Sequence, residues 1–383
     1  MTPECMRAGE DRRKVLQIIY GMNRGGVETW LMHVLRNIDR DQFEFHFLVE
    51  EHNEAAYDRE IRALGACIHR IGNHRNVLRY ASEFMALVEE HGPFDVIHSH
   101  VYSYSGFVMW LAKRAGIPTR IAHSHTAINR SKRNVARRSY EQAMRYLIRR
   151  YATHRIAISE QAGRALFGTQ TKSDCFGVLY YGLDFRRFLR GSRLMQLRND
   201  YNIPQGRKVI GHIGRFVPVK NHRFLLECVD VLIKQGEDVH LLCVGEGPLL
   251  ETLKASVYSR GLTDRCTFAG AHDDVMPFLY AMNVLALPSL WEGLGIVALE
   301  AQAAGVPVLA SAAVPREVDV VPGMVEHLSL ADGITVWTRN LLRIMRGPTI
   351  RTGNEVDLLE RSRFALSTCL EQLKLIYCET PGN

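Results

Sequence analysis

Two glutamates separated by glycines are the residues whose spacing most directly suggests chemistry. Glu292 and Glu300 stand eight positions apart, with Gly293 and Gly295 between them and a helix-forming run after them. Glycines at the start of a helix leave backbone N–H groups open to phosphate oxygens, and the helix dipole favours such an anion. A ligand along this segment would meet a carboxylate, then N–H donors, then a second carboxylate. A nucleotide sugar presents matching groups in that order, namely sugar hydroxyls, a diphosphate and ribose hydroxyls.

A short apolar strand is predicted just before this motif. The run Val284–Leu287 is followed by Pro288 and Ser289, which are turn residues. Glu292 is therefore expected in the loop after a strand, and Glu300 about one turn into the next helix. Two surface glutamates on an ordinary loop and helix are the alternative, because such pairs are common.

Two further glycine-rich turns follow predicted strands. Asn23 precedes Gly25 and Gly26, which come after the first strand and let the backbone approach a ligand at a helix start. The spacing is neither a dinucleotide-binding fingerprint nor a P-loop. A second turn, with Gly245 and Glu246, ends a later strand. Glycine turns end many strands, so a purely structural role is the alternative for both.

Two cations stand at a strand end in the second half of the chain. A strand is expected to end near Gly214, with Arg215 next and Lys220 at the start of the following helix. Cations at that place would oppose a diphosphate and stabilise a negative leaving group as a glycosidic bond breaks. A pair of surface cations without such a role is the alternative.

Two His-x-His pairs lie at the carboxyl ends of predicted strands. They are His98 with His100 and His123 with His125. The period of two along a strand puts both members of a pair on one face. Paired imidazoles are zinc ligands, so a metal site is one interpretation. Hydrogen-bonded histidines are the other, since no cysteine or carboxylate cluster accompanies either pair in the sequence.

Apolar runs of strand length, for example over 208–213, 239–244 and 284–287, alternate with helix-length segments. This alternation predicts parallel sheets with helices on both faces. The polar stretch 184–205 is the best domain boundary. We therefore expect an α/β fold of two doubly wound, Rossmann-like domains, over 1–190 and 191–360, that face an interdomain cleft. The last segment, 361–383, is predicted to hold an amphipathic helix over 361–378. An eight-fold barrel is the rival architecture.

The composition is that of a globular protein of 383 residues with a net charge of +7. No apolar run of about 18 residues is present, and the N-terminus lacks the apolar core of a signal peptide. The eight cysteines show no Cys-x-x-Cys spacing. These features favour the cytoplasm.

The segment from Arg130 to Arg155 is strongly basic. It holds nine Lys or Arg residues and a single acid, Glu141. An anionic membrane surface is one partner that such a segment could meet, on the inner face of the membrane. A solvated helical face is the alternative. No aromatic-interleaved strand or recognition helix indicates nucleic acid.

Taken together, these motifs resemble those of retaining GT-B glycosyltransferases, in the large family that includes bacterial capsule and exopolysaccharide transferases. Glu292 and Glu300 match its Glu-x7-Glu motif, and Arg215 with Lys220 matches its Gly-Arg-x-x-x-x-Lys-Asn signature. The first glycine turn resembles its Gly-Gly-x-Glu loop, and the second resembles its Val-Gly-x-Gly-Pro loop. The likeness runs over about 15–330. Many relatives have Gly-Phe-Gly or Gly-Leu-Pro after the first glutamate, whereas this chain has Gly-Leu-Gly-Ile, which leaves the donor sugar open.

The resemblance implies a role for each matching residue. Arg215 and Lys220 would hold the departing phosphate, Glu292 would orient the sugar, and His125 would support the sugar near the reacting carbon. His100 and Asn23 would lie on the acceptor side, and Glu300 would grip the ribose. The full set implied to bind the donor is Gly25, Gly26, Gly214, Gly245, Glu246, Ser289, Gly293, Leu294, Gly295, Ile296 and Glu300.

The resemblance also implies retention of the anomeric configuration, with UDP-sugar as the preferred donor and a glycan or lipid-linked acceptor. No metal cofactor is expected, the departing phosphate would help to deprotonate the acceptor, and the last helix would return to the first domain. A nucleotide-sugar epimerase of the same fold and a non-catalytic two-domain binding protein are the alternative functions. The missing fingerprint weighs against an NAD-dependent oxidoreductase.

Overall fold

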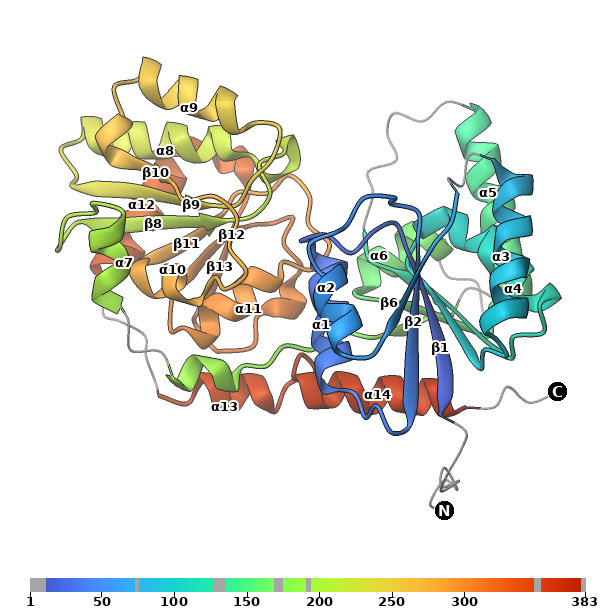
Figure 1. Cartoon of the computed structure of the whole chain (residues 1–383). Helices are drawn as coiled ribbons and strands as arrows, with labels where there is room; N and C mark the ends of the chain where they lie inside the picture. Colours follow the sequence, from blue (N-terminus) through green and yellow to red (C-terminus); the bar gives the residue numbers. More distant parts are fainter. Residues whose placement is uncertain are drawn as a thin grey trace. The chain divides into compact units, whose positions relative to one another are not determined.

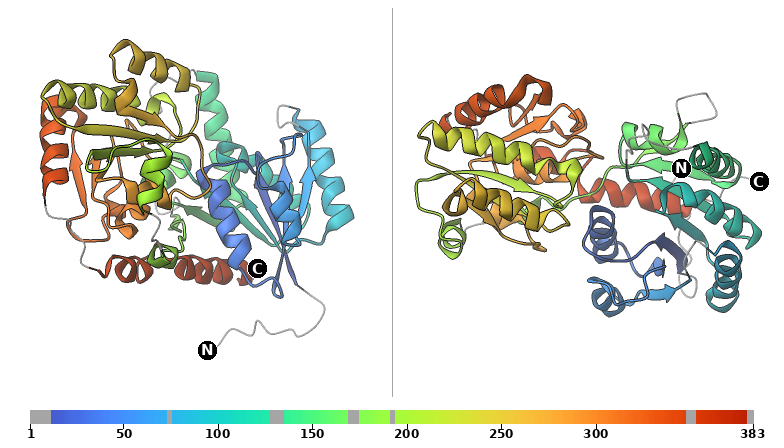
Figure 2. Two further views of the ribbon diagram at one scale, coloured as in Figure 1. Left: turned by 60° about the vertical axis from the view of Figure 1, so that its left-hand side comes forward. Right: turned by 90° about the horizontal axis from the view of Figure 1, so that it is seen from above.

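This computed structural model describes residues 12–72, 76–126, 135–168, 175–190, 194–347 and 353–379. The chain divides into two compact units, unit 1 with Met1–Leu183 and Arg363–Asn383, and unit 2 with Asp184–Ser362. Helices cover both faces of the sheet in each unit (Figure 1, Figure 2). In the described part of the chain, every helix is too short or too polar to span a membrane.

Unit 1 is built on a seven-stranded sheet with the order β3-β2-β1-β4-β5-β6-β7, in which all neighbours are parallel. Its strands are β1 Arg13–Ile19, β2 Phe43–Val49, β3 Cys67–Arg70, β4 Val96–Ser99, β5 Thr119–Ser124, β6 His154–Ala157 and β7 Gly177–Val178. Its helices are α1 Gly26–Asn37, α2 Asp58–Ala63, α3 Val77–His91, α4 Ser105–Arg114, α5 Val135–Tyr151, α6 Glu160–Phe167 and α14 Leu366–Cys378, with the 3-10 turn η1 Tyr102–Tyr104. Val15, Leu16 and Ile18 of β1 are buried, as expected for a parallel strand that is covered on both faces.

Unit 2 is built on a six-stranded parallel sheet with the order β10-β9-β8-β11-β12-β13. Its strands are β8 Lys208–Ile213, β9 Val239–Val244, β10 Cys266–Phe268, β11 Val284–Leu287, β12 Val308–Ser311 and β13 Val325–Leu328. Its helices are α7 Leu194–Asp200, α8 His222–Lys234, α9 Leu250–Ser259, α10 Met276–Ala281, α11 Ile296–Ala303, α12 Gly333–Arg346 and α13 Glu355–Glu360. Its 3-10 turns are η3 Arg186–Arg190, η4 Pro218–Lys220, η5 Thr263–Arg265, η6 Arg316–Val318 and η7 Leu330–Asp332. Phe216, Leu225 and Trp337 are fully buried in its core.

The prediction of two doubly wound sheets is confirmed, and the rival barrel is excluded because each unit has its own sheet. Strand β13 is not predicted from the sequence. It is an edge strand whose four residues are all half-exposed, so its apolar pattern is weak. The last helix begins at Leu366 rather than at 361. The N–H of Leu183 donates to Phe364 at 2.9 Å and the N–H of Leu366 donates to Leu183 at 3.0 Å. These hydrogen bonds join the residues just before the helix to the segment around Leu183.

Candidate active site

Lys220 and Glu292, which are 72 positions apart, form an ion pair in unit 2. The Nζ atom of Lys220 lies 2.8 Å from each carboxylate oxygen of Glu292. Only 19% and 14% of the two side chains are exposed, so water and salt screen the pair less than on an open surface. Lys220 ends the turn η4 after β8, and Glu292 lies in the loop after β11. The N–H of Leu290 donates to the carbonyl of Val219 at 2.8 Å and joins these two loops.

Two buried histidines lie close to Lys220. The Nδ1 atom of His212 is 2.8 Å from the carbonyl oxygen of Ala286, and its ring meets the ring of His222 edge to face at 4.4 Å. Burial holds the pKa of His212 well below its usual value. Burial, with the charge of Lys220, lowers the pKa of His222 to about 4. Both imidazoles are neutral near pH 7, so the positive charge at this corner comes from Lys220 and the exposed Arg215.

The glycine turns at Gly214 and Gly245 pack directly against each other. Gly245 has a φ of 137°, and a Cβ atom there would lie 2.2 Å from the carbonyl oxygen of Gly214, so only glycine fits. Two backbone hydrogen bonds, of 2.9 and 2.8 Å, join the two turns. This stacking fixes the backbone around Arg215, and it leaves the side chain of Glu246 exposed.

The loop between the two motif glutamates leads directly into α11. Gly295 caps this helix with a left-handed φ of 84°, and Leu294 anchors the loop in the core with 2% exposure. Gly293 and Ile296 flank these two residues and are both half-buried. The first turn of α11 therefore offers backbone N–H groups beside the Glu292 carboxylate, as an anion site requires.

Ser289 is buried below this loop. Its carbonyl oxygen accepts a hydrogen bond from the hydroxyl of Ser311 on β12 at 2.6 Å. Among the residues that the structure describes, nothing pairs with its own hydroxyl. An unpaired buried hydroxyl is costly, which marks Ser289 as a candidate ligand contact.

Glu300, the second motif glutamate, is paired with Arg187. The Nη2 atom of Arg187 lies 2.6 Å from the carboxylate, and the two side chains are 29% and 15% exposed. Burial raises the pKa of Glu300, and the Arg187 charge opposes that shift. Arg187 lies on η3, within the polar stretch that the sequence indicates only as a boundary.

The first glycine turn of unit 1 precedes α1. Gly25 is the N-cap, and Gly26 is the first helical residue. Asn23 holds the turn from its side chain, because its Nδ2 donates to Glu51 at 2.6 Å and its Oδ1 accepts from the N–H of Ala56 at 3.2 Å. A role of Asn23 toward an acceptor would therefore compete with bonds that shape the loop.

The two His-x-His pairs meet on the neighbouring strands β4 and β5. The Nδ1 atom of His100 lies 2.7 Å from Nε2 of His125, whose Nδ1 lies 2.6 Å from the hydroxyl of Tyr181. In the other couple, Nε2 of His98 lies 3.0 Å from Nδ1 of His123. Burial lowers the pKa of His100 to about 3 and holds the pKa of His125 well below its usual value. Both are therefore neutral imidazoles.

Gln17 and Tyr377 join the two couples into one chain. Gln17, on β1, contacts His100 at 2.8 Å through Oε1 and donates from Nε2 to the hydroxyl of Tyr377 at 3.1 Å. That hydroxyl lies 2.9 Å from His98. His98, His100 and His123 also have ligand atoms within 4.8 Å of one another. The zinc interpretation therefore has the necessary proximity, although hydrogen bonds already engage each ring.

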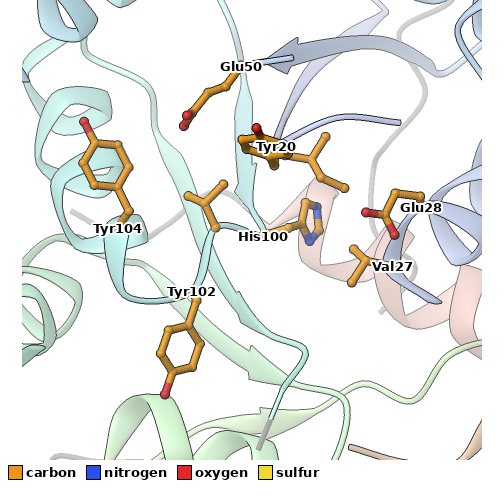
Figure 3. A pocket seen from close by; sticks show the side chains of 9 residues that line it. Tyr20, Val27, Glu28, Glu50, His100, Tyr102 and Tyr104 are labelled. Atoms are coloured by element: carbon orange, nitrogen blue, oxygen red, sulfur yellow. The ribbon is translucent and has the colours of Figure 1, made fainter. Parts of the chain in front are cut away.

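A cavity of about 320 Å³ lies at the carboxyl ends of β1, β2 and β4 in unit 1. Figure 3 shows Glu28, Glu50 and His100 around it, together with Tyr20, Tyr102 and Tyr104. His100 is neutral, so the two carboxylates set the charge of this cavity. Such a lining favours neutral, hydroxyl-rich groups over anions.

The basic segment lies partly on α5, and residues 130–134 lie outside the described residues. Arg137 contacts Glu141 at 3.3 Å. Arg145 and Arg149 donate to backbone carbonyl groups at the end of α6. Part of the positive charge of the basic segment is therefore engaged in hydrogen bonds and an ion pair within unit 1.

Sequence reasoning misses Arg187, His212 and His222 in unit 2, and Gln17 and Tyr377 in unit 1. The signal for His212 was available, since it stands two positions before Gly214 in a buried strand. The others become partners only through packing between distant segments, which leaves no local pattern.

Two protein families match parts of the chain, the Glycosyl transferase 4-like domain over residues 25–173 and Glycosyl transferases group 1 over residues 195–325. The putative glycosyltransferase EpsF of Bacillus subtilis is 33% identical over 87% of this chain and 88% of EpsF. The capsular polysaccharide biosynthesis glycosyltransferase CapH of Staphylococcus aureus is 24% identical over 75% of this chain and 78% of CapH. Among solved structures, Anabaena HepE in complex with UDP-glucose has a TM-score of 0.75 at 19% identity, over 94% of this chain and 98% of HepE. That last likeness concerns the fold.

Proposed function

Because this chain belongs to the group 1 family of GT-B glycosyltransferases, we propose that it transfers a sugar from a UDP-sugar to a hydroxyl group of a polysaccharide precursor, with retention of the anomeric configuration. The UDP-sugar donor is supported by the likeness to Anabaena HepE, whose structures hold UDP and UDP-glucose. The polysaccharide acceptor is supported by the likeness to CapH, a glycosyltransferase of capsular polysaccharide biosynthesis.

The ion pair between Lys220 and Glu292, beside the N-terminus of α11, is the observation that carries this proposal. The diphosphate would take the charge of Lys220 and of the exposed Arg215, and the first N–H groups of α11 would donate to its oxygens. As the bond between the sugar carbon and the phosphate oxygen breaks, negative charge grows on the leaving group. Preorganised cations stabilise that charge most in the transition state, so they lower the barrier.

The departing phosphate oxygen would also serve as the base. The acceptor hydroxyl would form its bond to the anomeric carbon on the face that the phosphate leaves, and its proton would pass to that oxygen. This route retains the configuration and needs no carboxylate nucleophile beneath the ring. It assigns the leaving-group charge to Lys220 and Arg215, so we propose that the reaction proceeds without a metal ion.

The two motif glutamates would bind the hydroxyl groups at the ends of the donor. Glu292 would accept from the sugar and Glu300 from the ribose, with Arg187 keeping the second carboxylate in place. His125 would support the sugar as a neutral imidazole. Both of its ring nitrogens bond to protein groups, so it would exchange one of those bonds for a bond to a sugar hydroxyl.

The acceptor would bind in unit 1, where the cavity lined by Glu28 and Glu50 suits a neutral sugar. We further propose that the protein acts in the cytoplasm, at the inner face of the membrane, through the basic segment on α5. Flotation with vesicles that contain anionic lipid tests this contact, and binding that ignores lipid charge would refute it.

Release of UDP is the central assay. The protein is incubated with UDP-glucose, UDP-galactose or UDP-N-acetylglucosamine and with lipid-linked or alkyl glycoside acceptors, and the product linkage is read by NMR. We expect acceptor-dependent UDP release, a product with the donor's anomeric configuration, and unchanged turnover in EDTA. An epimerase would give an altered sugar without an acceptor, and a binding protein would give no turnover. An inverted linkage would refute the retaining route.

A further inference from the structure

A cysteine and two histidines gather at one edge of the unit 1 sheet. Cys67 and His69 lie on the edge strand β3, and His46 lies on the neighbouring strand β2. Each offers a ligand atom, and these atoms all lie within 4.8 Å of one another. We propose that His46, Cys67 and His69 bind a zinc ion, at a site separate from the donor residues of unit 2.

The register of the two strands creates this cluster. His46 pairs with Cys67 across the sheet, and His69 shares a face with Cys67 because strand residues alternate with a period of two. The rings of His46 and His69 are nearly parallel, with centroids 5.2 Å apart, and meet edge to edge, with Nδ1 of His46 2.9 Å from Nε2 of His69. In a tetrahedral zinc site, two nitrogen ligands stand about 3.3 Å apart. The ion is therefore admitted by a small opening and tilting of this pair, with the Nε2 proton of His69 moved to its Nδ1 so that both facing nitrogens present lone pairs.

Glu44 fixes the tautomer that His46 needs as a ligand. Its Oε1 lies 2.8 Å from Nε2 of His46. An ionised carboxylate only accepts, so Nε2 carries the proton and Nδ1 keeps its lone pair toward the cluster. The other carboxylate oxygen accepts from Arg12 at 3.0 Å, which orients Glu44. A carboxylate behind a histidine is the usual support of zinc-bound imidazoles.

The ligand types and the exposure of the cluster suit metal binding. A metal ion binds imidazole nitrogens and thiolates in their deprotonated forms, and binding releases the protons that they hold. The thiol of Cys67 is exposed, so solvent can bring the ion and accept the proton that the thiol releases.

One further side chain and one opposing charge lie nearby. The ring of His91, at the end of α3, is 4.4 Å from that of His69, but His91 is not one of the three residues whose ligand atoms lie within 4.8 Å of one another. The ammonium of Lys14 donates to the carbonyl of His91 at 3.0 Å and opposes a second cation. The thiolate charge of Cys67 offsets it. Sulfur with imidazole is a donor set that selects zinc over magnesium or calcium, and a bound ion would fasten β3 to β2.

Cobalt substitution tests this site without reference to activity. Untagged, reduced and chelator-treated protein is titrated with Co²⁺, which reports thiolate ligation by a near-ultraviolet charge-transfer band and tetrahedral geometry by intense visible bands. We expect both signals, and we expect Zn²⁺ to abolish them by displacing Co²⁺. Cys67→Ser should remove the charge-transfer band, whereas Cys175→Ser, at another exposed cysteine, should keep it. Glu44→Gln should weaken binding by about 10–100-fold.

Two results would overturn the proposal. The first is a thiolate band that persists in Cys67→Ser or is never formed. The second is a cobalt spectrum of histidine ligation alone, which would place the ion at the buried trio of His98, His100 and His123. Circular dichroism of Cys67→Ser checks its fold, and His69→Gln, which should also lose affinity, provides a second variant.

Discussion

Removal of the charge of Lys220 is the sharpest test of the proposed donor site. The change Lys220→Met keeps the apolar stem and deletes the ammonium that lies 2.8 Å from both oxygens of Glu292. If this ammonium stabilises the leaving phosphate, its loss removes one preorganised charge from the transition state. Losses of that kind cost about 10²–10³-fold in kcat, or about 2.7–4 kcal/mol. We expect a decrease of that size in UDP release.

The same change also affects stability, and the two effects can be separated. Lys220→Met leaves the Glu292 carboxylate without its cation in a place where only 14% of its side chain is exposed. Open-surface pairs contribute about 0–1 kcal/mol, whereas breaking a buried pair costs about 3–5 kcal/mol, so we expect a loss of about 1–2 kcal/mol here. The double variant with Glu292→Gln removes the stranded charge. Its free energy of unfolding should recover, but its kcat should not.

A matched control lies at the end of α8, the helix that follows Lys220 in the chain. Lys234 pairs with Asp230 at 3.0 Å, and 73% of its side chain is exposed, so Lys234→Met makes the identical substitution outside the proposed site. Its turnover should stay within about two-fold of the wild type, and its stability within about 0.5 kcal/mol. Urea unfolding and UDP release are measured on all four proteins. Wild-type turnover in Lys220→Met, or a kcat that recovers with stability in the double variant, would reduce the pair to a structural contact.

Three other perturbations have definite expected results. Burial raises the pKa of Glu300 above its ordinary 4.5. The stability that this group contributes is therefore lost as pH rises through the raised pKa. Over that pH range, urea unfolding should show the free energy of unfolding of the wild type falling relative to that of Glu300→Gln. Gly245→Ala should cost about 3 kcal/mol or more because its Cβ would clash with the adjoining turn, whereas Gly236→Ala, with positive φ and open space, should cost about 1 kcal/mol. Tyr377→Phe should cost about 1–3 kcal/mol by breaking the buried hydrogen-bond chain; Tyr258→Phe, at an 80% exposed tyrosine, should be neutral, and equal effects of the two would refute the chain's importance.

Buried parallel strands could be predicted from the sequence with accurate limits. β8, β9 and β11 occur over the predicted ranges because each is an apolar run that ends in glycine, proline or a polar residue. The half-exposed β13 could not be predicted, since an edge strand lacks a continuous apolar signal. The glycine turns could be recognised in the sequence. Only the structure reveals that position 245 must be glycine, because the carbonyl oxygen of Gly214 leaves no room for a Cβ atom there.

Partners in the candidate site depend on sheet order, which the sequence does not state. Lys220 and Glu292 meet because β8 and β11 are neighbours, although β9 and β10 lie between them in the chain. The hydrogen-bond chain of unit 1 closes only because Tyr377, on the last helix, reaches Gln17 and His98. Such pairs join residues that are far apart in the sequence. The motifs therefore identify the residues of the site but not their partners.

The state of the two motif glutamates bears on the alternative in which they are ordinary surface residues. Glu292 and Glu300 are 14% and 15% exposed, and each is matched by one cation. Desolvating a carboxylate is costly, and replacing such an ion pair with apolar side chains is often neutral or stabilising. Stability alone therefore gives little reason to keep one such pair just before α11 and a second within it. A ligand rich in hydroxyl groups and phosphate gives a reason, because each carboxylate and each cation then has a group to bind. Under this reasoning, replacing either glutamate by glutamine weakens donor binding more than it weakens the fold.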